Sequence, residues 1–438
     1  MENKITKIIA EEIKDSRENP TIKVTVFIGN ASDSFSVPSG ASTGAHEAHE
    51  LRDPEPEQAR YGAGSDGKGG MKKAIWNVEN VIAPSLVGQD VLNQKEIDRI
   101  MIELDGTPNK DNLGGNSMIG VSIACAKVAA KVSKIEVYEH LRMLSEMKPS
   151  RRIPHLFMNL INGGKHAKND LAFQEYQIVS DTDNVNEAVD IGIKIQNSLK
   201  KIIKKDLGEE SLVLGDEGGY APKTSDIKKP LEYLSEAIKE NNFQDKVWLA
   251  LDVAASSFYE PARTAEQGGN GKYNINSKDT RPNDRSHSVG QVSKEELMNI
   301  YNSLITEFNL FSIEDPFNEE DFDSFKKLKD DNSKLKIIGD DLTVTNKNIL
   351  QKAINKGSIN AMIIKPNQIG TLSETLETMR LARENDIELI ISHRSGETDD
   401  DFIADLCYAF SCFGLKSGSP IKSERIVKYK RLMQITHQ

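Results

Sequence analysis

Cysteine is scarce in this sequence: its 438 residues include three, Cys125, Cys407 and Cys412. None of them belongs to a Cys-x-x-Cys pair, and their number is odd. These features argue against a disulfide framework and against a cysteine-ligated metal site. We therefore expect three reduced thiols in a cytoplasmic protein.

Long apolar runs and an excess of positive charge are also missing. No run approaches the roughly 18 residues that a membrane-spanning helix needs, and the first 20 residues are charged throughout. Lysine and arginine total 56 against 67 acidic residues, a net charge of −11. This balance argues against nucleic acid or an anionic membrane surface as partner. An anionic small molecule would need positive charge gathered locally, by Lys365, Arg394 and Lys416 or by a metal ion.

The remaining composition is ordinary, with 37% hydrophobic and 28% charged residues, as in a soluble globular protein. The length predicts two or three domains. Apolar periodicity predicts strands at 4–13 and 21–29 and helices at roughly 71–82, 94–104 and 116–133. The polar run 146–154 carries two prolines and marks a predicted domain boundary.

Beyond that boundary, short apolar runs alternate with amphipathic segments. From Glu314 onward, the charged residues that end or follow these runs lie 23 to 28 residues apart, close to the roughly 30 residues of one strand–helix unit. The spacing predicts a parallel β/α barrel with its site at one mouth, and a doubly wound open sheet is the alternative. We interpret the polar stretches 54–70 and 260–290 as surface insertions, the second without a role in the core.

Three carboxylates, Asp252, Glu314 and Asp340, each end a predicted strand of this region. In a barrel these ends converge, and converging carboxylates repel one another unless a cation neutralises them. Oxygen ligands without cysteine favour Mg²⁺ or Mn²⁺ over zinc. The alternative is that each acid caps a helix or pairs with a surface lysine.

Two further residues are candidates for proton transfer. Lys365 also ends a predicted strand and could act as a general base, provided that Lys416 or a bound metal lowers its pKa. The alternative is a solvated or salt-bridged lysine. Glu217 lies in the glycine-rich turn 215–219, where it could act as a protonated acid, and the alternative is a plain tight turn.

Arg394 and Ser395 fit a clamp for a phosphate or carboxylate, with a fork of donors beside a hydroxyl. The alternative is an ion pair between Arg394 and Asp399–Asp401. His166 follows a Gly-Gly-Lys run and is by default a loop histidine. The loop SGASTG (39–44) is either a connector or a lid whose hydroxyls reach an ion or phosphate.

Taken together, these stretches resemble the enolase family. The motifs that appear in the family's order are SGASTG, DGTPNK, NGGKHAKNDLAFQEY, GDEGGYAP, LDVAASSFY, SIEDPF, GDDLTVTN, KPNQIGT, SHRSGET and KSGSP with KSERIVKY. The resemblance implies an α/β protein. It would have an N-terminal α+β domain at 1–145 with a mobile loop at 37–53, and an irregular, TIM-like β/α barrel at 146–438 with an early antiparallel strand.

The resemblance also implies a lyase that reversibly dehydrates 2-phosphoglycerate to phosphoenolpyruvate in glycolysis and gluconeogenesis. Asp252, Glu314 and Asp340 would hold one Mg²⁺, and Ser42 would help to bind a second Mg²⁺ that arrives with substrate. Superfamily members of this kind use a lysine or histidine base with one or two Mg²⁺ ions.

The same resemblance assigns roles to individual residues. Lys365 would be the base, and Glu217 the acid, with a pKa raised by burial or by neighbouring carboxylates. The residues that would line the substrate are His166, Gln174, Glu175, His393, Arg394, Ser395 and Lys416. The protein would be a homodimer or a homo-octamer in the cytoplasm.

Two other functions fit parts of the pattern. A dehydratase or racemase of sugar acids from the same superfamily is disfavoured by the GDEGG turn and the SGASTG loop. A binding or structural role on this scaffold stays open as an added role, and it would be the primary role only if the site were damaged, whereas the motif residues are all present. One departure from the family pattern is Glu18 in DSRENP, where glycine is usual. If that position needs a positive φ, the turn must adjust.

Overall fold

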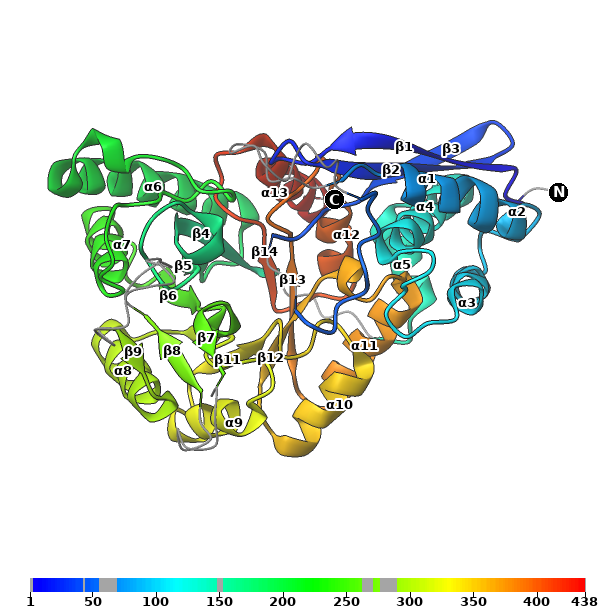
Figure 1. Ribbon diagram of the computed structural model, residues 1–438. Helices are drawn as coiled ribbons and strands as arrows, with labels where there is room; N and C mark the ends of the chain where they lie inside the picture. Colours follow the sequence, from blue (N-terminus) through cyan, green and yellow to red (C-terminus); the bar gives the residue numbers. More distant parts are fainter. Residues whose placement is uncertain are drawn as a thin grey trace.

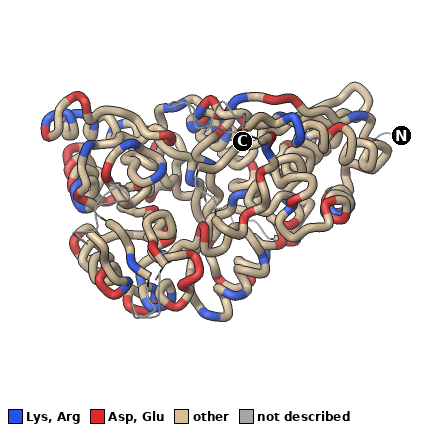
Figure 2. Tube along the Cα trace, in the orientation of Figure 1, with Lys and Arg blue, Asp and Glu red and all other residues tan. Residues whose placement is uncertain are grey.

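The computed structural model of the protein describes residues 3–41, 44–54, 69–147, 153–261, 271–275 and 290–437. Figure 1 shows a three-stranded sheet with its helices beside a closed barrel. Within those ranges, no helix is long and apolar enough to cross a membrane. Figure 2 shows acidic and basic residues interspersed over both parts.

An antiparallel sheet forms the N-terminal part, with strands β1 (Lys7–Lys14), β2 (Pro20–Ile28) and β3 (Ala31–Ser36). The two predicted strands correspond to β1 and β2. The apolar residues Ile22, Val24 and Val26 alternate along β2 and are buried, as one face of a half-buried sheet requires. The sequence pattern missed β3, because ASDSFS contains few apolar residues and Phe35 alone is buried there.

The helices of this part are α1 (Lys72–Asn77), α2 (Ala83–Leu86), α3 (Gln94–Asp105), α4 (Gly115–Ser133) and α5 (Val137–Leu144), with a π-helical turn at Val78–Ile82. The predicted helix at 71–82 therefore includes that turn. Helix α4 is apolar on most faces because it contacts the sheet on one side and α11 (Leu372–Glu384) of the barrel on the other.

The strands of the closed barrel are β4 (His155–Asn162), β5 (Glu175–Ser180), β6 (Val247–Asp252), β10 (Ser312–Glu314), β11 (Lys336–Gly339), β12 (Ala361–Ile364), β13 (Glu388–Ser392) and β14 (Gly414–Lys416). Strand β5 is antiparallel to β4 and β6, and the other neighbouring pairs are parallel. The spacing-based expectation of an entirely parallel barrel is wrong. The early antiparallel strand that the resemblance implied is confirmed.

Helices surround this barrel, and apolar side chains fill it. Besides α11, the helices are α6 (Val185–Leu207), α7 (Lys229–Glu240), α8 (Lys294–Phe308), α9 (Phe322–Asp331), α10 (Lys347–Lys356), α12 (Phe402–Ala409) and α13 (Ser423–Thr436). Phe157, Ile338, Ile363 and Ile390 belong to the cluster inside the barrel. A filled barrel leaves the chemistry to the carboxyl ends of its strands.

The stretch 260–290 does contribute to the core, contrary to the expectation from its polar composition. Its described part includes β8 (Lys272–Asn274), which lies in a small sheet between β7 (Tyr259–Glu260) and β9 (Gln291–Val292). The ring of Tyr273 on β8 is buried, and its hydroxyl accepts a hydrogen bond from Asn318 N (3.0 Å). Residues 55–68 of the other predicted insertion lie outside the described part of the chain.

The N-terminal part caps a helix of the barrel. Ser122 Oγ on α4 accepts a hydrogen bond from Leu372 N (2.9 Å), and Asp98 on α3 accepts one from Ser373 N (2.9 Å) and one from Ser373 Oγ (2.6 Å). These bonds satisfy free N–H groups in the first turn of α11. Because α11 follows the strand that ends before Lys365, the cap fixes the connection on which Lys365 lies.

The turn 15–19 accommodates Glu18 in the left-handed region, with φ of 63°. Asp15 organises the turn, since its Oδ1 accepts from Arg17 N (2.8 Å) and Asn19 N (2.9 Å). The Glu18 side chain points outward and pairs with Lys14. The position therefore has the conformation that favours glycine, and the turn forms with a glutamate in it.

We predict that Glu18→Gly is more stable than Glu18→Ala by about 0.5–1 kcal/mol, because alanine has a Cβ that is strained at positive φ and glycine has none. The greater freedom of the unfolded glycine variant offsets part of this gain. Both variants lose the pair with Lys14, so their difference isolates the backbone. Urea unfolding of the two variants measures it. Equal stability would show that the turn relaxes without strain.

Candidate active site

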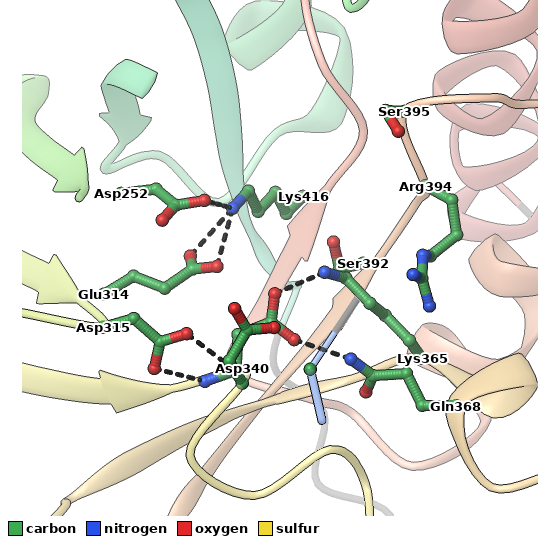
Figure 3. A network of polar contacts seen from close by, with 12 residues as sticks. Asp252, Glu314, Asp315, Asp340, Lys365, Gln368, Ser392, Arg394, Ser395 and Lys416 are labelled. Atoms are coloured by element: carbon green, nitrogen blue, oxygen red, sulfur yellow. Dashed lines mark hydrogen bonds and ion pairs between the residues drawn. The ribbon is translucent and has the colours of Figure 1, made fainter. Parts of the chain in front are cut away.

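Two acidic residues end adjacent parallel strands at one mouth of the barrel. Asp252 is the last residue of β6 and Glu314 the last of β10, and the strand register aligns them. Asp340 directly follows β11, the next strand. All three are buried. The structure thus brings the three predicted carboxylates to one place (Figure 3).

Lys416, the last residue of β14, lies among these carboxylates. Its Nζ is 2.9 Å from Asp252 Oδ2, 2.8 Å from Glu314 Oε2 and 3.2 Å from Glu175 Oε2. Burial alone would lower the pKa of Lys416, but these surrounding negative charges hold it well above its usual value. Lys416 is therefore a permanent cation at the centre of the acidic cluster.

Lys365 forms an ion pair with the third carboxylate, Asp340. Gln368 Nε2 donates to the other oxygen of Asp340 (3.0 Å). Burial lowers the pKa of Lys365, and Asp340 raises it more strongly than Arg394 and Lys416 lower it, so the net pKa is raised. Arg394 and Lys416 do lower the pKa of Lys365, as expected of neighbouring cations, but the ion pair with Asp340 outweighs them, so the net lowering that a base needs is absent in this arrangement.

Glu217 lies between two buried histidines. Its Oε2 is 3.3 Å from His166 Nδ1 and accepts from Asn159 Nδ2 (2.5 Å), and its Oε1 is 3.3 Å from His393 Nε2. Burial acts to raise the pKa of Glu217, but the nearby His166, and after it His393, outweigh burial and hold the pKa well below its usual value. The expected raised pKa is wrong, since histidines surround this carboxylate more closely than Glu175 does.

Two neighbours of Glu217, His166 and Glu175, have raised pKa values. Burial lowers the pKa of His166, but Glu217 and Glu175 together raise it to about 10. Burial and the charge of Glu217 raise the pKa of Glu175 to about 7. Gln174, the residue before Glu175, donates from Nε2 to Asp252 Oδ2 (3.3 Å). A proton is thus stored beside Glu217 rather than on it.

Arg394 follows β13 and binds a residue of the N-terminal part. Its Nη1 and Nη2 donate to the Glu47 carboxylate at 2.9 and 3.3 Å. The proposed alternative pairing with Asp399–Asp401 is wrong, because Glu47 is the acid in contact. The hydroxyl of Ser395 accepts from Ala41 N (2.7 Å), so the loop that begins at 39 packs on both clamp residues.

Several residues of the site were missed by sequence reasoning. Asp315 accepts from Asp340 N (3.0 Å) and Asp341 N (2.7 Å), and its own φ is 43°. Gln368 Nε2 also donates to Glu47 (3.2 Å), which joins the loop to Asp340. The doubled acids in SIEDPF and GDDLTVTN were a signal for Asp315 and Asp341. No local pattern indicated Glu47.

Most of the predicted site residues line one cavity of about 20 Å³ at the barrel mouth. The predicted residues on its wall are His166, Gln174, Glu175, Glu217, Asp252, Asp340, Lys365, His393, Arg394, Ser395 and Lys416. Glu314 is not part of the cavity wall, but it forms an ion pair with Lys416, which is. Ser42 falls outside the described residues, while its neighbours Ala41 and Gly44 line a larger adjoining cavity of about 520 Å³ that also reaches Arg394.

Among the described residues, Asp315, Asp340 and Asp341 bring carboxylate oxygens close enough together to hold a metal ion, and Asp340 is one of the three predicted ligands. Among the described residues around the cavity, buried carboxylates outnumber the cations Lys416, Arg394 and the partly buried Lys365. Burial and the charge of Asp252 raise the pKa of Glu314 well above its usual value, and burial and Asp340 raise that of Asp341 to about 8. The raised pKa values mean that neighbouring carboxylates repel one another when ionised, and a further cation would relieve this repulsion. Carboxylate oxygens are suitable ligands for a hard ion such as Mg²⁺.

We predict that Lys416→Met lowers the free energy of unfolding by about 3–5 kcal/mol in the presence of a chelator, because it leaves buried carboxylates without their central cation. Lys347→Met is the control. Lys347 pairs with Glu377 on the surface, with about half of each side chain exposed, and its loss costs less than about 1 kcal/mol. Urea unfolding compares the two. Equal losses would mean that the cluster does not depend on Lys416.

Comparison with known proteins gives matches over nearly the whole chain. Residues 5–141 match the family described as "Enolase, N-terminal domain", and residues 150–438 match "Enolase, C-terminal TIM barrel domain". A protein of Methanocaldococcus jannaschii named enolase is 42% identical over 436 residues, 99% of this chain and 95% of the relative. Enolase B of Dictyostelium discoideum is 42% identical with the same coverage. The enolase of Thermococcus kodakarensis is 40% identical, over 100% of this chain and 96% of the relative.

Proposed function

The chain belongs to the enolase family, lyases that reversibly dehydrate 2-phosphoglycerate to phosphoenolpyruvate, and we propose that the cavity at the barrel mouth carries out this reaction. The observation that carries the proposal is the lining of that one cavity. Lys365 as a candidate base, Glu217 as a candidate acid and Arg394 as a candidate phosphate ligand all open onto it.

Asp252, Glu314 and Asp340 are the residues that we propose hold Mg²⁺, with Ser42 assisting a second ion that arrives with substrate. When bound, the ions supply positive charge that stabilises the dianion formed on the substrate carboxylate. The proton to be removed lies next to that carboxylate and is very weakly acidic. Lys416 contributes a further fixed positive charge at the same point.

Lys365 is our proposed base. Its present proton is stabilised by Asp340, which is the largest influence that raises its pKa. Once Asp340 is engaged elsewhere, burial and the cations Arg394 and Lys416 lower that pKa and outweigh the opposing charge of Glu314. Engagement of Asp340 thus frees Lys365 to accept the substrate proton.

Glu217 is our proposed acid, and it acts together with His166. The hydroxide that leaves the neighbouring carbon needs a proton, and the raised pKa of His166 stores one 3.3 Å from Glu217 Oε2. Passage of that proton to Glu217 would place it on the carboxyl group that faces the cavity. The raised pKa of Glu175 adds a second proton near this pair.

Arg394 and Ser395 are our proposed phosphate ligands. In this structure Glu47 and Ala41 N engage the groups that a phosphate would bind. Substrate binding therefore requires the loop that carries Glu47 and Ala41 to shift or to share these donors. Holding the phosphate would keep the proton, base and leaving group aligned.

Three expectations remain proposals. We propose a domain boundary at 145/146, which falls between the two family matches, at 5–141 and 150–438. A homodimer or homo-octamer and a cytoplasmic location remain predictions from family membership.

We predict that purified protein forms phosphoenolpyruvate from 2-phosphoglycerate in an ultraviolet assay with Mg²⁺, and that a chelator abolishes the signal. Lys365→Ala lowers kcat by about a thousandfold, within the range expected for loss of a general base, yet still binds Mg²⁺. Lys352→Ala, which removes an exposed lysine paired with Glu320, retains activity.

Absence of a Mg²⁺-dependent signal in the parent protein would refute the proposed function. Full activity of Lys365→Ala beside an active parent would refute only the role of Lys365 as base.

A further inference from the structure

Arg425, on the C-terminal helix α13, reaches from outside the barrel to three parts of the site. Its side chain is fully buried. Nη1 donates to Arg394 O (2.6 Å), and Nη2 donates to Ser395 O (2.7 Å) and Asp216 O (3.3 Å). One guanidinium thus joins the backbone of the proposed phosphate clamp to the turn that carries Glu217.

The fourth contact of Arg425 determines the state of a histidine. Its Nη1 lies 2.6 Å from His393 Nδ1. A guanidinium is always charged in proteins and has donors but no acceptor. His393 Nδ1 must therefore offer its lone pair, which leaves the single ring proton on Nε2.

The ring proton so placed faces Glu217, because His393 Nε2 lies 3.3 Å from Glu217 Oε1. A second proton on His393 is unfavourable. Burial and the charge of Arg425 lower the pKa of His393 to about 4, although the nearby Glu217 acts to raise it. The Nε2–H of neutral His393 is then the group nearest to Glu217 Oε1 on that side. The other oxygen faces His166 and Asn159.

We propose that Arg425 is a positioning residue that fixes the Nε2–H tautomer of His393 and so directs the mobile proton of Glu217 to the Oε2 side, toward His166. The role rests on the proposed function of Glu217 as acid. Arg425 contacts neither the proposed metal ligands nor the cavity, and acts through His393 and through the backbone at Asp216, Arg394 and Ser395.

The packing around Gly418 keeps Glu217, His393 and Arg425 close to one another. Its φ is 68°, and a Cβ there would lie 2.9 Å from Glu217 O, 2.9 Å from His393 Cε1 and 3.2 Å from Arg425 Cδ. Any side chain at this position would push the three groups apart. Ser419 N also donates to Glu217 O (3.0 Å), so the segment before α13 holds the acid turn directly.

A second basic residue of α13 holds the same clamp segment. Lys428 Nζ is 2.7 Å from Glu397 Oε2, and Glu397 Oε1 accepts from Arg394 N (3.2 Å). The backbone of Arg394 is therefore fixed by two side chains of one helix. Arg425 differs from Lys428 in that it also contacts His393.

The direct test is the tautomer of His393 in the full-length protein labelled with [¹⁵N]histidine, of which the chain has eight. Long-range ¹H–¹⁵N correlation distinguishes protonated from unprotonated ring nitrogens, and His393→Gln identifies the signal. We expect Nδ1 without a proton and Nε2 with one at neutral pH. A proton on Nδ1, alone or with Nε2, would overturn the proposal whether or not the protein is active.

Two substitutions test the consequence for catalysis. Arg425→Lys keeps a charged group that can only donate, so the tautomer and most of kcat should be retained. In Arg425→Gln, the amide oxygen can accept a hydrogen bond from Nδ1–H, so the two tautomers of His393 should become mixed. We then expect kcat to fall about ten- to a hundredfold, a range typical of a misplaced catalytic group, with a smaller change in KM. Arg431→Gln, on the same helix and paired with Asp405 and Glu136 instead, is the control and should keep both.

Loss of kcat in Arg425→Gln with an unchanged tautomer would reduce Arg425 to a structural role and overturn the proposal. An inactive parent protein with the expected tautomer would refute the proposed function and leave the hydrogen-bond assignment standing. The two failures are therefore distinguishable.

Discussion

Negative charge buried at the mouth of the barrel is the constraint on which the rest of the site depends. Parallel strands bring their carboxyl ends together, and β6 and β10 end in aligned acids with Asp340 beside them. Carboxylates this close and this buried are stable only with cations among them. Lys416 forms ion pairs with Asp252 and Glu314, and Lys365 forms one with Asp340. The remaining negative charge makes the site suitable for a divalent ion.

Support for this centre comes from parts of the chain that lie far from it in sequence. The N-terminal part supplies Glu47, which binds Arg394 and Gln368, and Asp98, which caps the helix after Lys365. The C-terminal helix supplies Arg425, which holds the clamp and the acid turn. The N-terminal part and the C-terminal helix therefore cooperate to position groups on the barrel.

The strand ends could be predicted from sequence because each combines a short apolar run with a charged residue, a local signal that Asp252, Glu314 and Lys365 all carry. Features that depend on partners distant in sequence could not. The core role of Tyr273 and the contact of Glu47 with Arg394 have no local signature, and the antiparallel strand β5 was implied by the family resemblance alone. The pKa shift of Glu217 was predicted with the wrong sign for the same reason, since His166 and His393 lower it, and the ion pair with Asp340 outweighs the expected effect of neighbouring cations on Lys365.

The central proposal is that the buried carboxylates form a centre that binds a divalent cation. Calorimetric titration of Mg²⁺ into the full-length protein, beside Glu314→Gln, tests it most directly. We predict saturable binding to the parent protein and affinity at least about tenfold weaker in the variant, a difference of about 1.4 kcal/mol or more. Undetectable binding to the parent, or equal affinity in Glu314→Gln, would contradict the account.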